Sequence, residues 1–96
     1  MTFRVFIHNG PLKGRSVQIN KDSASIGRSP GNDIQINDPS VSKKHAIIFQ
    51  TPKGYSIEDL RSQNGTWIDG SLIGSGKKIK VENGIPISIG NVLLSV

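Results

Sequence analysis

Two segments of the chain contain side chains that suit the binding of an anion. The first segment covers residues 27–46, and the second covers residues 59–67. They contain four of the twelve lysines and arginines, namely Arg28, Lys43, Lys44 and Arg61. If the two segments lie side by side, these residues form a concentrated positive site.

The side chains of these segments also indicate which kind of anion would bind. Arg28 carries a planar fork of N–H donors, Ser42 a hydroxyl and Lys43 a mobile positive charge. A guanidinium, a hydroxyl and an ammonium group together suit a phosphate. Asn64 adds an amide with donors and an acceptor, which is what hydrogen bonding to a peptide main chain requires. The set therefore suits a phosphorylated peptide.

The elements that must position these side chains are short β-strands, because apolar and polar residues alternate through nearly the whole chain. The expected strands cover residues 3–7, 15–19, 24–27, 34–36, 45–50, 55–59, 66–68, 79–81, 85–89 and 92–96. The stretches 9–14 and 71–78 are expected to be turns, and no stretch has helical spacing with good helix formers. The pattern predicts an all-β fold, an antiparallel sandwich or barrel, in which loops at one end carry the function.

Composition sets limits on the class of protein. The 96 residues include 34% hydrophobic and 20% charged residues, which suits one globular domain covering residues 1–96. Cysteine is absent and the two histidines, His8 and His45, are far apart, so we expect no disulfide, no metal and no cofactor. No apolar run is long enough to cross a membrane and no signal peptide is visible, which predicts an intracellular, cytoplasmic domain.

The sequence Asn64-Gly65-Thr66 allows three interpretations. Asn64-Gly65 fits a tight hairpin turn, because both residue types tolerate positive φ angles. The tripeptide also fits the acceptor pattern for N-glycosylation, which an intracellular domain would leave unmodified. In the third interpretation, Asn64 is a ligand-binding residue on a loop, and a turn at Gly65 aims its amide.

Three short motifs, in order along the chain, resemble the signature of the forkhead-associated domain. These motifs are Gly27-Arg28, Ser42-x-x-His45 and Asn64-Gly65-Thr66, and the flanking letters NDI, VSKKHA and DL also match. Each motif is weak alone, but the ordered set on an all-β chain of this length is specific. The resemblance implies an antiparallel β-sandwich of about eleven strands that recognises phosphothreonine through loops at one end.

The resemblance also implies binding roles for individual residues. Arg28 would contact the phosphate and the neighbouring main chain, Ser42 would hydrogen-bond the phosphate and Lys43 would add positive charge. Asn64 would bind the peptide backbone beside the phosphothreonine. Gln63 departs from the family pattern, in which a small hydroxyl residue is more usual, but its longer amide is also expected to reach the ligand.

Other residues of the signature would support the site. His45 is expected to brace the binding loops from beneath, Gly27 and Gly65 to be turn residues that shape the site, and Thr66 to belong to the same structural support. Trp67 is expected to be a core residue, with a platform beside the site as the alternative.

Other functions remain to be weighed. Ser42, His45 and Asp59 are the residue types of a hydrolase triad, but no G-x-S-x-G motif surrounds Ser42, so we expect no enzyme. The net charge of +5 leaves nucleic acid as the alternative ligand, although the chain has few aromatic residues for base stacking. The expected partner is a threonine-phosphorylated protein, and hence indirectly a Ser/Thr kinase. We expect the isolated domain to be monomeric.

Overall fold

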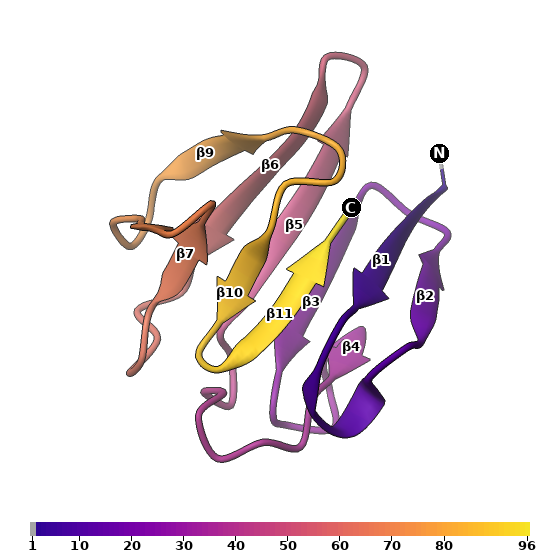
Figure 1. The fold of residues 1–96 in the computed structure, drawn as a ribbon. Helices are drawn as coiled ribbons and strands as arrows, with labels where there is room; N and C mark the ends of the chain where they lie inside the picture. Colours follow the sequence, from indigo (N-terminus) through magenta and orange to yellow (C-terminus); the bar gives the residue numbers. More distant parts are fainter. Residues whose placement is uncertain (1) are drawn as a thin grey trace.

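The structure, a computed structural model that describes residues 2–96, consists almost entirely of short strands. They are β1 Phe3–Ile7, β2 Ser16–Ile19, β3 Ser23–Gly27, β4 Ile34–Gln35, β5 Ala46–Thr51, β6 Gly54–Asp59, β7 Thr66–Ile68, β8 Ser71–Leu72, β9 Lys78–Val81, β10 Ile87–Ile89 and β11 Val92–Ser95. One sheet has six strands in the order β2-β1-β11-β10-β7-β8, and the other has five in the order β4-β3-β5-β6-β9. The two sheets form the layers of a sandwich (Figure 1). The expected all-β sandwich is therefore confirmed.

The alternation of apolar and polar residues explains how the two layers pack. In β1, Phe3, Val5 and Ile7 are buried, whereas Arg4 and Phe6 are exposed. Side chains of a strand point alternately to the two faces of its sheet, so one face of each sheet builds a shared apolar core. The core is completed by Ile19, Ala24, Ile26, Ile34, Ile36, Val41, Ala46, Ile48, Ile57, Val81, Ile87, Ile89, Val92, Leu94 and Val96.

Three details of the fold differ from the sequence prediction. The short strand β8 lies within the stretch 71–78 that was expected to be a turn, and a 3₁₀ helix, η1 Gly10–Leu12, lies within the stretch 9–14. Strand β4 pairs with β3 in parallel, which makes the five-stranded sheet mixed. Alternation could not reveal these features, because a two-residue strand is too short for a period and the direction of pairing depends on the path of the intervening loop.

The predicted hairpin at Asn64-Gly65 is wrong. Strand β6 lies in the five-stranded sheet and β7 in the six-stranded sheet, so the segment between them crosses from one layer to the other. Of the two residues Asn64 and Gly65, only Gly65 has a positive φ, of 85°, whereas a type I′ turn requires positive φ angles at both. Asp69 and Gly70, with φ angles of 49° and 82°, form the two-residue turn between the antiparallel strands β7 and β8.

Several loops meet at one end of the sandwich (Figure 1, lower end). They are the segments that connect β3 to β4, β4 to β5, β6 to β7, and β10 to β11. Backbone hydrogen bonds join them, since Arg28 donates to Ser42 and Gly90 donates to Gly65. Among residues 2–96, no helix is long and apolar enough to cross a membrane.

Candidate functional site

The β3–β4 and β4–β5 loops are in direct contact at Gly27. A Cβ atom at Gly27 would lie 2.2 Å from the carbonyl oxygen of Lys43, so only glycine allows this approach. The Arg28 backbone N–H donates to the Ser42 carbonyl at 2.9 Å, and the Asn32 amide donates to the Lys43 carbonyl at 2.8 Å. Gly27 is thus the last residue of β3 and not a turn residue as predicted, and it shapes the site by permitting close contact.

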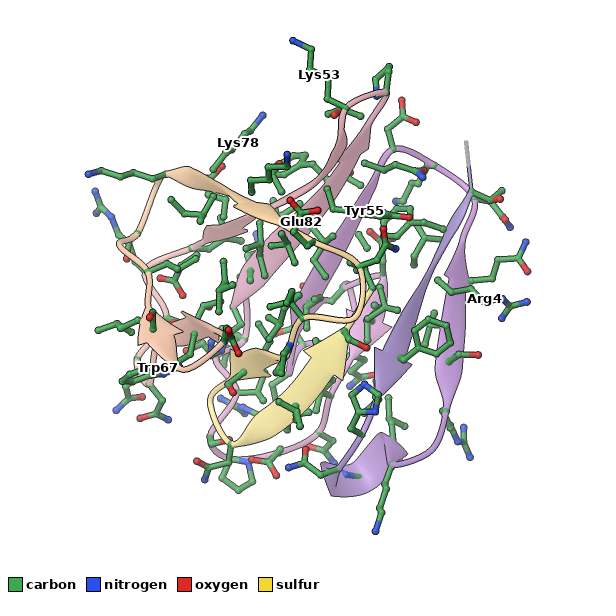
Figure 2. The ribbon with its side chains drawn as sticks, turned by 45° about the horizontal axis from the view of Figure 1, so that its top comes forward. Arg4, Lys53, Tyr55, Trp67, Lys78 and Glu82 are labelled. Carbon is green, nitrogen blue, oxygen red and sulfur yellow. The ribbon has the colours of Figure 1, made fainter. Side chains whose placement is uncertain are left out.

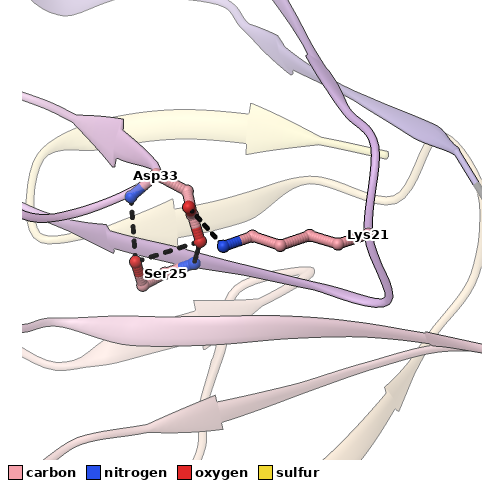
Figure 3. Close-up of polar contacts among 3 residues, drawn as sticks. All are labelled: Lys21, Ser25 and Asp33. Carbon is pink, nitrogen blue, oxygen red and sulfur yellow. Dashed lines mark hydrogen bonds and ion pairs between the residues drawn. The ribbon is translucent and has the colours of Figure 1, made fainter.

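A polar cluster fixes the same β3–β4 loop from its other side (Figure 3). One Asp33 carboxylate oxygen accepts from the Ser25 backbone N–H at 2.9 Å, and the other lies 2.7 Å from Lys21 Nζ. In return, the Ser25 hydroxyl accepts from the Asp33 backbone N–H at 2.9 Å. The bonds from Lys21 and Ser25 outweigh partial burial and lower the pKa of Asp33. The loop that carries Arg28 is therefore held at both ends.

Arg28 is half-buried and its orientation is fixed. Its Nε donates to the Val41 carbonyl at 3.1 Å, and its own carbonyl accepts from the Gln35 amide at 3.2 Å. The two terminal amino groups of the guanidinium are left for a ligand, because no other hydrogen bond from this side chain is present among residues 2–96. Such a fork suits two oxygen atoms of a phosphate.

His45 is fully buried and joins the two binding segments. Its Nδ1 lies 3.0 Å from the backbone nitrogen of Ser42, and its Nε2 lies 2.8 Å from the carbonyl oxygen of Gly65. Since Ser42 N–H donates and the Gly65 carbonyl accepts, the ring carries its proton on Nε2 and is neutral. Burial lowers the pKa of His45, against the opposing effects of the Gly65 carbonyl and the Asp59 charge. The neutral imidazole thereby connects the β4–β5 loop to the β6–β7 loop.

Ser42 and Asn64 lie in two loops that are joined by hydrogen bonds from the β6–β7 loop to the β4–β5 loop. The Ser42 hydroxyl oxygen accepts from the Gln63 backbone N–H at 2.9 Å, which leaves the hydroxyl proton available to an anion. The Asn64 amide donates to the Ser40 carbonyl at 2.9 Å. The second N–H and the carbonyl oxygen of the Asn64 side-chain amide remain to pair with a peptide main chain.

Ser40 connects the β4–β5 loop to the β10–β11 turn. Its hydroxyl donates to Asp38 at 2.6 Å and accepts from the Asn91 backbone N–H at 2.9 Å. The hydrogen bonds from Ser40 lower the pKa of Asp38. A Cβ atom at Gly90 would lie 2.3 Å from the Ser40 carbonyl oxygen, so glycine is again required by a close approach.

Asp59 organises the base of the β6–β7 segment. Its buried carboxylate accepts hydrogen bonds from the hydroxyls of Ser62, of Thr66 at 2.7 Å and of Ser75 at 2.9 Å. Burial raises the pKa of Asp59, but these bonds outweigh it and the net pKa lies below the ordinary value. Thr66 is fully buried and Gly65 has a positive φ, so both belong to the framework of the loop.

The positive charge predicted from the sequence lies around this loop cluster. Arg28 and Ser42 are half-buried, and the side chains of Lys43, Lys44 and Arg61 are exposed. All the signature residues come from the four loops at one end of the sandwich or from the strand ends beside them. No group of three potential metal-ligating side chains is found within residues 2–96. The arrangement can therefore bind an anion through a guanidinium, a hydroxyl and nearby ammonium groups.

Trp67 lies outside the apolar core, and the expectation of a core residue is wrong. The half-buried indole lies on the outer face of β7, opposite Ser88 of β10, and its Nε1 donates to the Asn64 carbonyl at 3.4 Å (Figure 2). An open pocket of about 480 Å³ lies beside it, lined by Ser40, Asn64, Trp67, Gly70, Ser88, Gly90 and Asn91. Trp67 is thus a wall beside the loops, as in the platform alternative.

The sequence analysis did not identify the residues that tie the loops together. Asn32 bonds the Lys43 carbonyl, and Ser40 bonds Asn64 and Asn91, which are distant in the sequence. Asp38 holds the Ser40 hydroxyl through a local contact. Asn32 and Asp38 stand in turn-like stretches, and short polar residues there often bond to backbone groups, which is the only signal in the sequence. Nothing in the sequence marks the approach of Gly90 to Ser40.

The fold and the loop cluster together define a class of protein, a β-sandwich module with a basic recognition site at one end. The chain belongs to the FHA domain family, whose model matches residues 24–90. This match contains all three motifs of the predicted signature.

Comparisons with individual proteins agree with this assignment. The chain is 38% identical over 79 residues to the probable serine/threonine-protein kinase fhkC of Dictyostelium discoideum, covering 77% of this chain and 13% of that protein. It is 28% identical over 80 residues to the oxoglutarate dehydrogenase inhibitor of Corynebacterium jeikeium, covering 78% of this chain and 56% of that protein. The chain therefore spans only part of the length of these curated relatives.

Solved structures show the same fold. The FHA domain of the CT664 protein from Chlamydia trachomatis superimposes with a TM-score of 0.88 at 23% identity, covering 99% of this chain and 95% of that one. Mycobacterium tuberculosis EmbR, solved in complex with a low affinity phosphopeptide, gives a TM-score of 0.81 at 30% identity and covers 96% of this chain and 24% of that one.

Proposed function

We propose that this chain binds threonine-phosphorylated peptides of partner proteins through the loops of residues 27–46 and 59–67. The observation that carries the proposal is that Arg28 is held beside Ser42, because its backbone N–H donates to the Ser42 carbonyl and its Nε donates to the Val41 carbonyl. His45 in turn joins the loop of Ser42 to the loop of Asn64. The family match and the phosphopeptide complex of the similar EmbR chain support it. In this proposal Arg28, Ser42 and Lys43 bind the phosphate.

The flanking residues of the peptide must also contribute to affinity. A charge-assisted hydrogen bond adds roughly 1.5 to 3 kcal/mol, and less at an exposed site screened by salt. Two or three such bonds fall short of the roughly 8 kcal/mol of a micromolar complex. Asn64 supplies main-chain contacts in this proposal, and the pocket of about 480 Å³ beside it offers room for a neighbouring side chain.

Recognition is favoured over catalysis by the geometry around His45. The imidazole accepts from the backbone N–H of Ser42 and does not bond its hydroxyl, so it is not placed to remove the hydroxyl proton. We accordingly propose a binding module without catalytic activity of its own. The nucleic-acid alternative has no specific observation in its favour. Within residues 2–96, the half-buried ring of Trp67 is the one aromatic ring beside the loops, and a single ring offers no run of stacking platforms.

The proposal extends to the setting in which the module works. Residues 1–96 act as one recognition domain, monomeric in isolation, inside the cell where a Ser/Thr kinase phosphorylates its partner. The identity of fhkC as a probable serine/threonine-protein kinase supports a role near kinase signalling.

A peptide library centred on phosphothreonine tests the proposal. We expect the chain to select phosphorylated members over identical unphosphorylated and phosphoserine peptides, and Arg28→Ala to reduce binding below detection. Arg4→Ala is the matched control, because Arg4 lies on β1 away from the loops (Figure 2), and within residues 2–96 its side chain bonds only Ser16 and Gln18. Equal binding of the unphosphorylated library, or an Arg28→Ala variant with full affinity, would contradict the proposal. A parallel titration with single-stranded and duplex oligonucleotides tests the alternative.

A further inference from the structure

We propose that a second pocket beside the binding loops takes an apolar side chain of the same phosphopeptide, and that Leu72 selects it. This pocket has a volume of about 340 Å³ and is lined by Asp59, Ser62, Gln63, Asn64, Gly65, Trp67, Leu72, Ile73, Gly74 and Ser75. Asn64 and Trp67 line this pocket as well as the pocket beside Ser88, so they stand between the two. The inference rests on the proposed phosphopeptide binding and adds a second specificity site to it.

Leu72 gives this pocket an apolar wall that is largely exposed to solvent. Its side chain is 59% exposed, and within residues 2–96 the only other exposed large hydrophobic side chain is that of Phe6, at 41%. Leu72 also touches the binding loop itself, since a Cβ atom at Gly65 would lie 2.7 Å from Leu72 Cδ1. Trp67 lies opposite Leu72 across the β7–β8 pair, and Ile73 follows it. An apolar ligand group seated here would remove this surface from water, which is favourable.

The polar groups of the pocket select against a negatively charged side chain. The hydroxyls of Ser62 and Ser75 donate to the Asp59 carboxylate and are therefore occupied. The lowered pKa of Asp59 keeps this carboxylate ionised at neutral pH, and no cation is paired with it among the described residues. An acidic ligand side chain would meet an unbalanced negative charge in partly buried surroundings, which is costly.

Gln63 links this pocket to the proposed phosphate site. The Gln63 backbone N–H donates to Ser42 Oγ, while its exposed side-chain amide bonds no residue of the described chain and lines the pocket. A peptide advances about 3.3 Å per residue when extended, so a residue close to the phosphothreonine can reach across this boundary. The Gln63 amide is free to bond the peptide main chain as it passes.

Selection from the same phosphothreonine library by matched variants tests this inference. We expect the wild-type chain to enrich Leu, Ile, Val or Met and to reject Asp and Glu at one position near the phosphothreonine. Leu72→Ser should abolish the preference at that position and leave the selection at other positions unchanged. It should also lower the affinity for the selected peptide by about fivefold. Phe6→Ser is the control, because it removes the other exposed apolar side chain, on β1, four strands from β8 in the same sheet. Thermal unfolding of both variants confirms that the fold is retained.

The possible results separate this inference from the proposed function. Suppose that phosphopeptides bind and that binding depends on Arg28, but that the Leu72→Ser variant selects the same residues as the wild-type chain with the same affinity. The second pocket then plays no part, and only this inference is overturned. If Leu72→Ser changes the oligomeric state and not the peptide selection, the surface belongs to an interface between copies, which also overturns it. If no phosphopeptide binds the wild-type chain, both proposals are wrong.

Discussion

At the scale of single residues, the site depends on the neutral ring of His45. Its two nitrogens make opposite hydrogen bonds, accepting from Ser42 and donating to Gly65, and no ordinary replacement of similar size supplies both at these positions. His45 was identified from the sequence only because it belongs to an ordered motif. Its partners were not predictable, since both contacts depend on how the β4–β5 and β6–β7 loops meet.

His45→Ala should therefore affect both stability and binding. The change leaves the Ser42 N–H and the Gly65 carbonyl without their partner and opens a cavity in a fully buried position, at a cost of roughly 3 kcal/mol of unfolding free energy. Urea denaturation measures this cost, and titration of a phosphopeptide measures the accompanying loss of affinity. His8→Ala is the control, since the His8 side chain is exposed and its one hydrogen bond within residues 2–96 is to Ser95. A stable His45→Ala variant with normal affinity would contradict the role assigned to the ring.

At the scale of the elements, the strands were predictable and the contacts between loops were not. Alternation located β1, β5 and β6 within one or two residues of their observed bounds, because each has one face in the core. The parallel pairing of β3 with β4 and the short β8 were missed. Gly27 was identified as important for the wrong reason, because a close approach between two loops leaves no trace in local sequence.

Gly27→Ala tests whether that approach positions the site. The added Cβ would lie 2.2 Å from the Lys43 carbonyl oxygen, so the two loops must separate, and we expect phosphopeptide affinity to fall at least tenfold with a loss of about 1 to 3 kcal/mol of stability. Gly31→Ala in the same loop is the matched control, because its Cβ would meet nothing within 4 Å and its φ is not positive. Equal behaviour of the two variants in calorimetric titration and thermal unfolding would show that the contact is dispensable.

At the scale of the whole molecule, the buried polar groups predict how stability depends on pH. The pKa of His45 is lowered in the folded chain, whereas in the unfolded chain it returns to about 6.5. Below pH 6.5 the unfolded state therefore takes up a proton that the folded state does not, and stability falls. Asp33, Asp38 and Asp59 also have lowered pKa values, so the carboxylates add a further loss only as the pH falls below 3.8.

Denaturation at two pH values checks the first of these steps. Between pH 7.5 and 5.5 we expect the unfolding free energy to decrease by up to about 1.4 kcal/mol. When one proton binds only to the unfolded state, each pH unit below the unfolded pKa of about 6.5 lowers the unfolding free energy by this amount. His45→Gln should remove this decrease, because glutamine does not titrate. An unchanged slope in the variant would assign the pH dependence to another group.

The buried imidazole also provides an observable signal. A ring proton on Nε2 that is fully enclosed and bonded to a backbone carbonyl exchanges slowly with water, so it should appear as a separate, far-downfield resonance in a proton NMR spectrum at neutral pH. That resonance reports whether the β4–β5 and β6–β7 loops are assembled. Its presence before any peptide is added would mean that the loops are already ordered, and that association proceeds without a slow folding step.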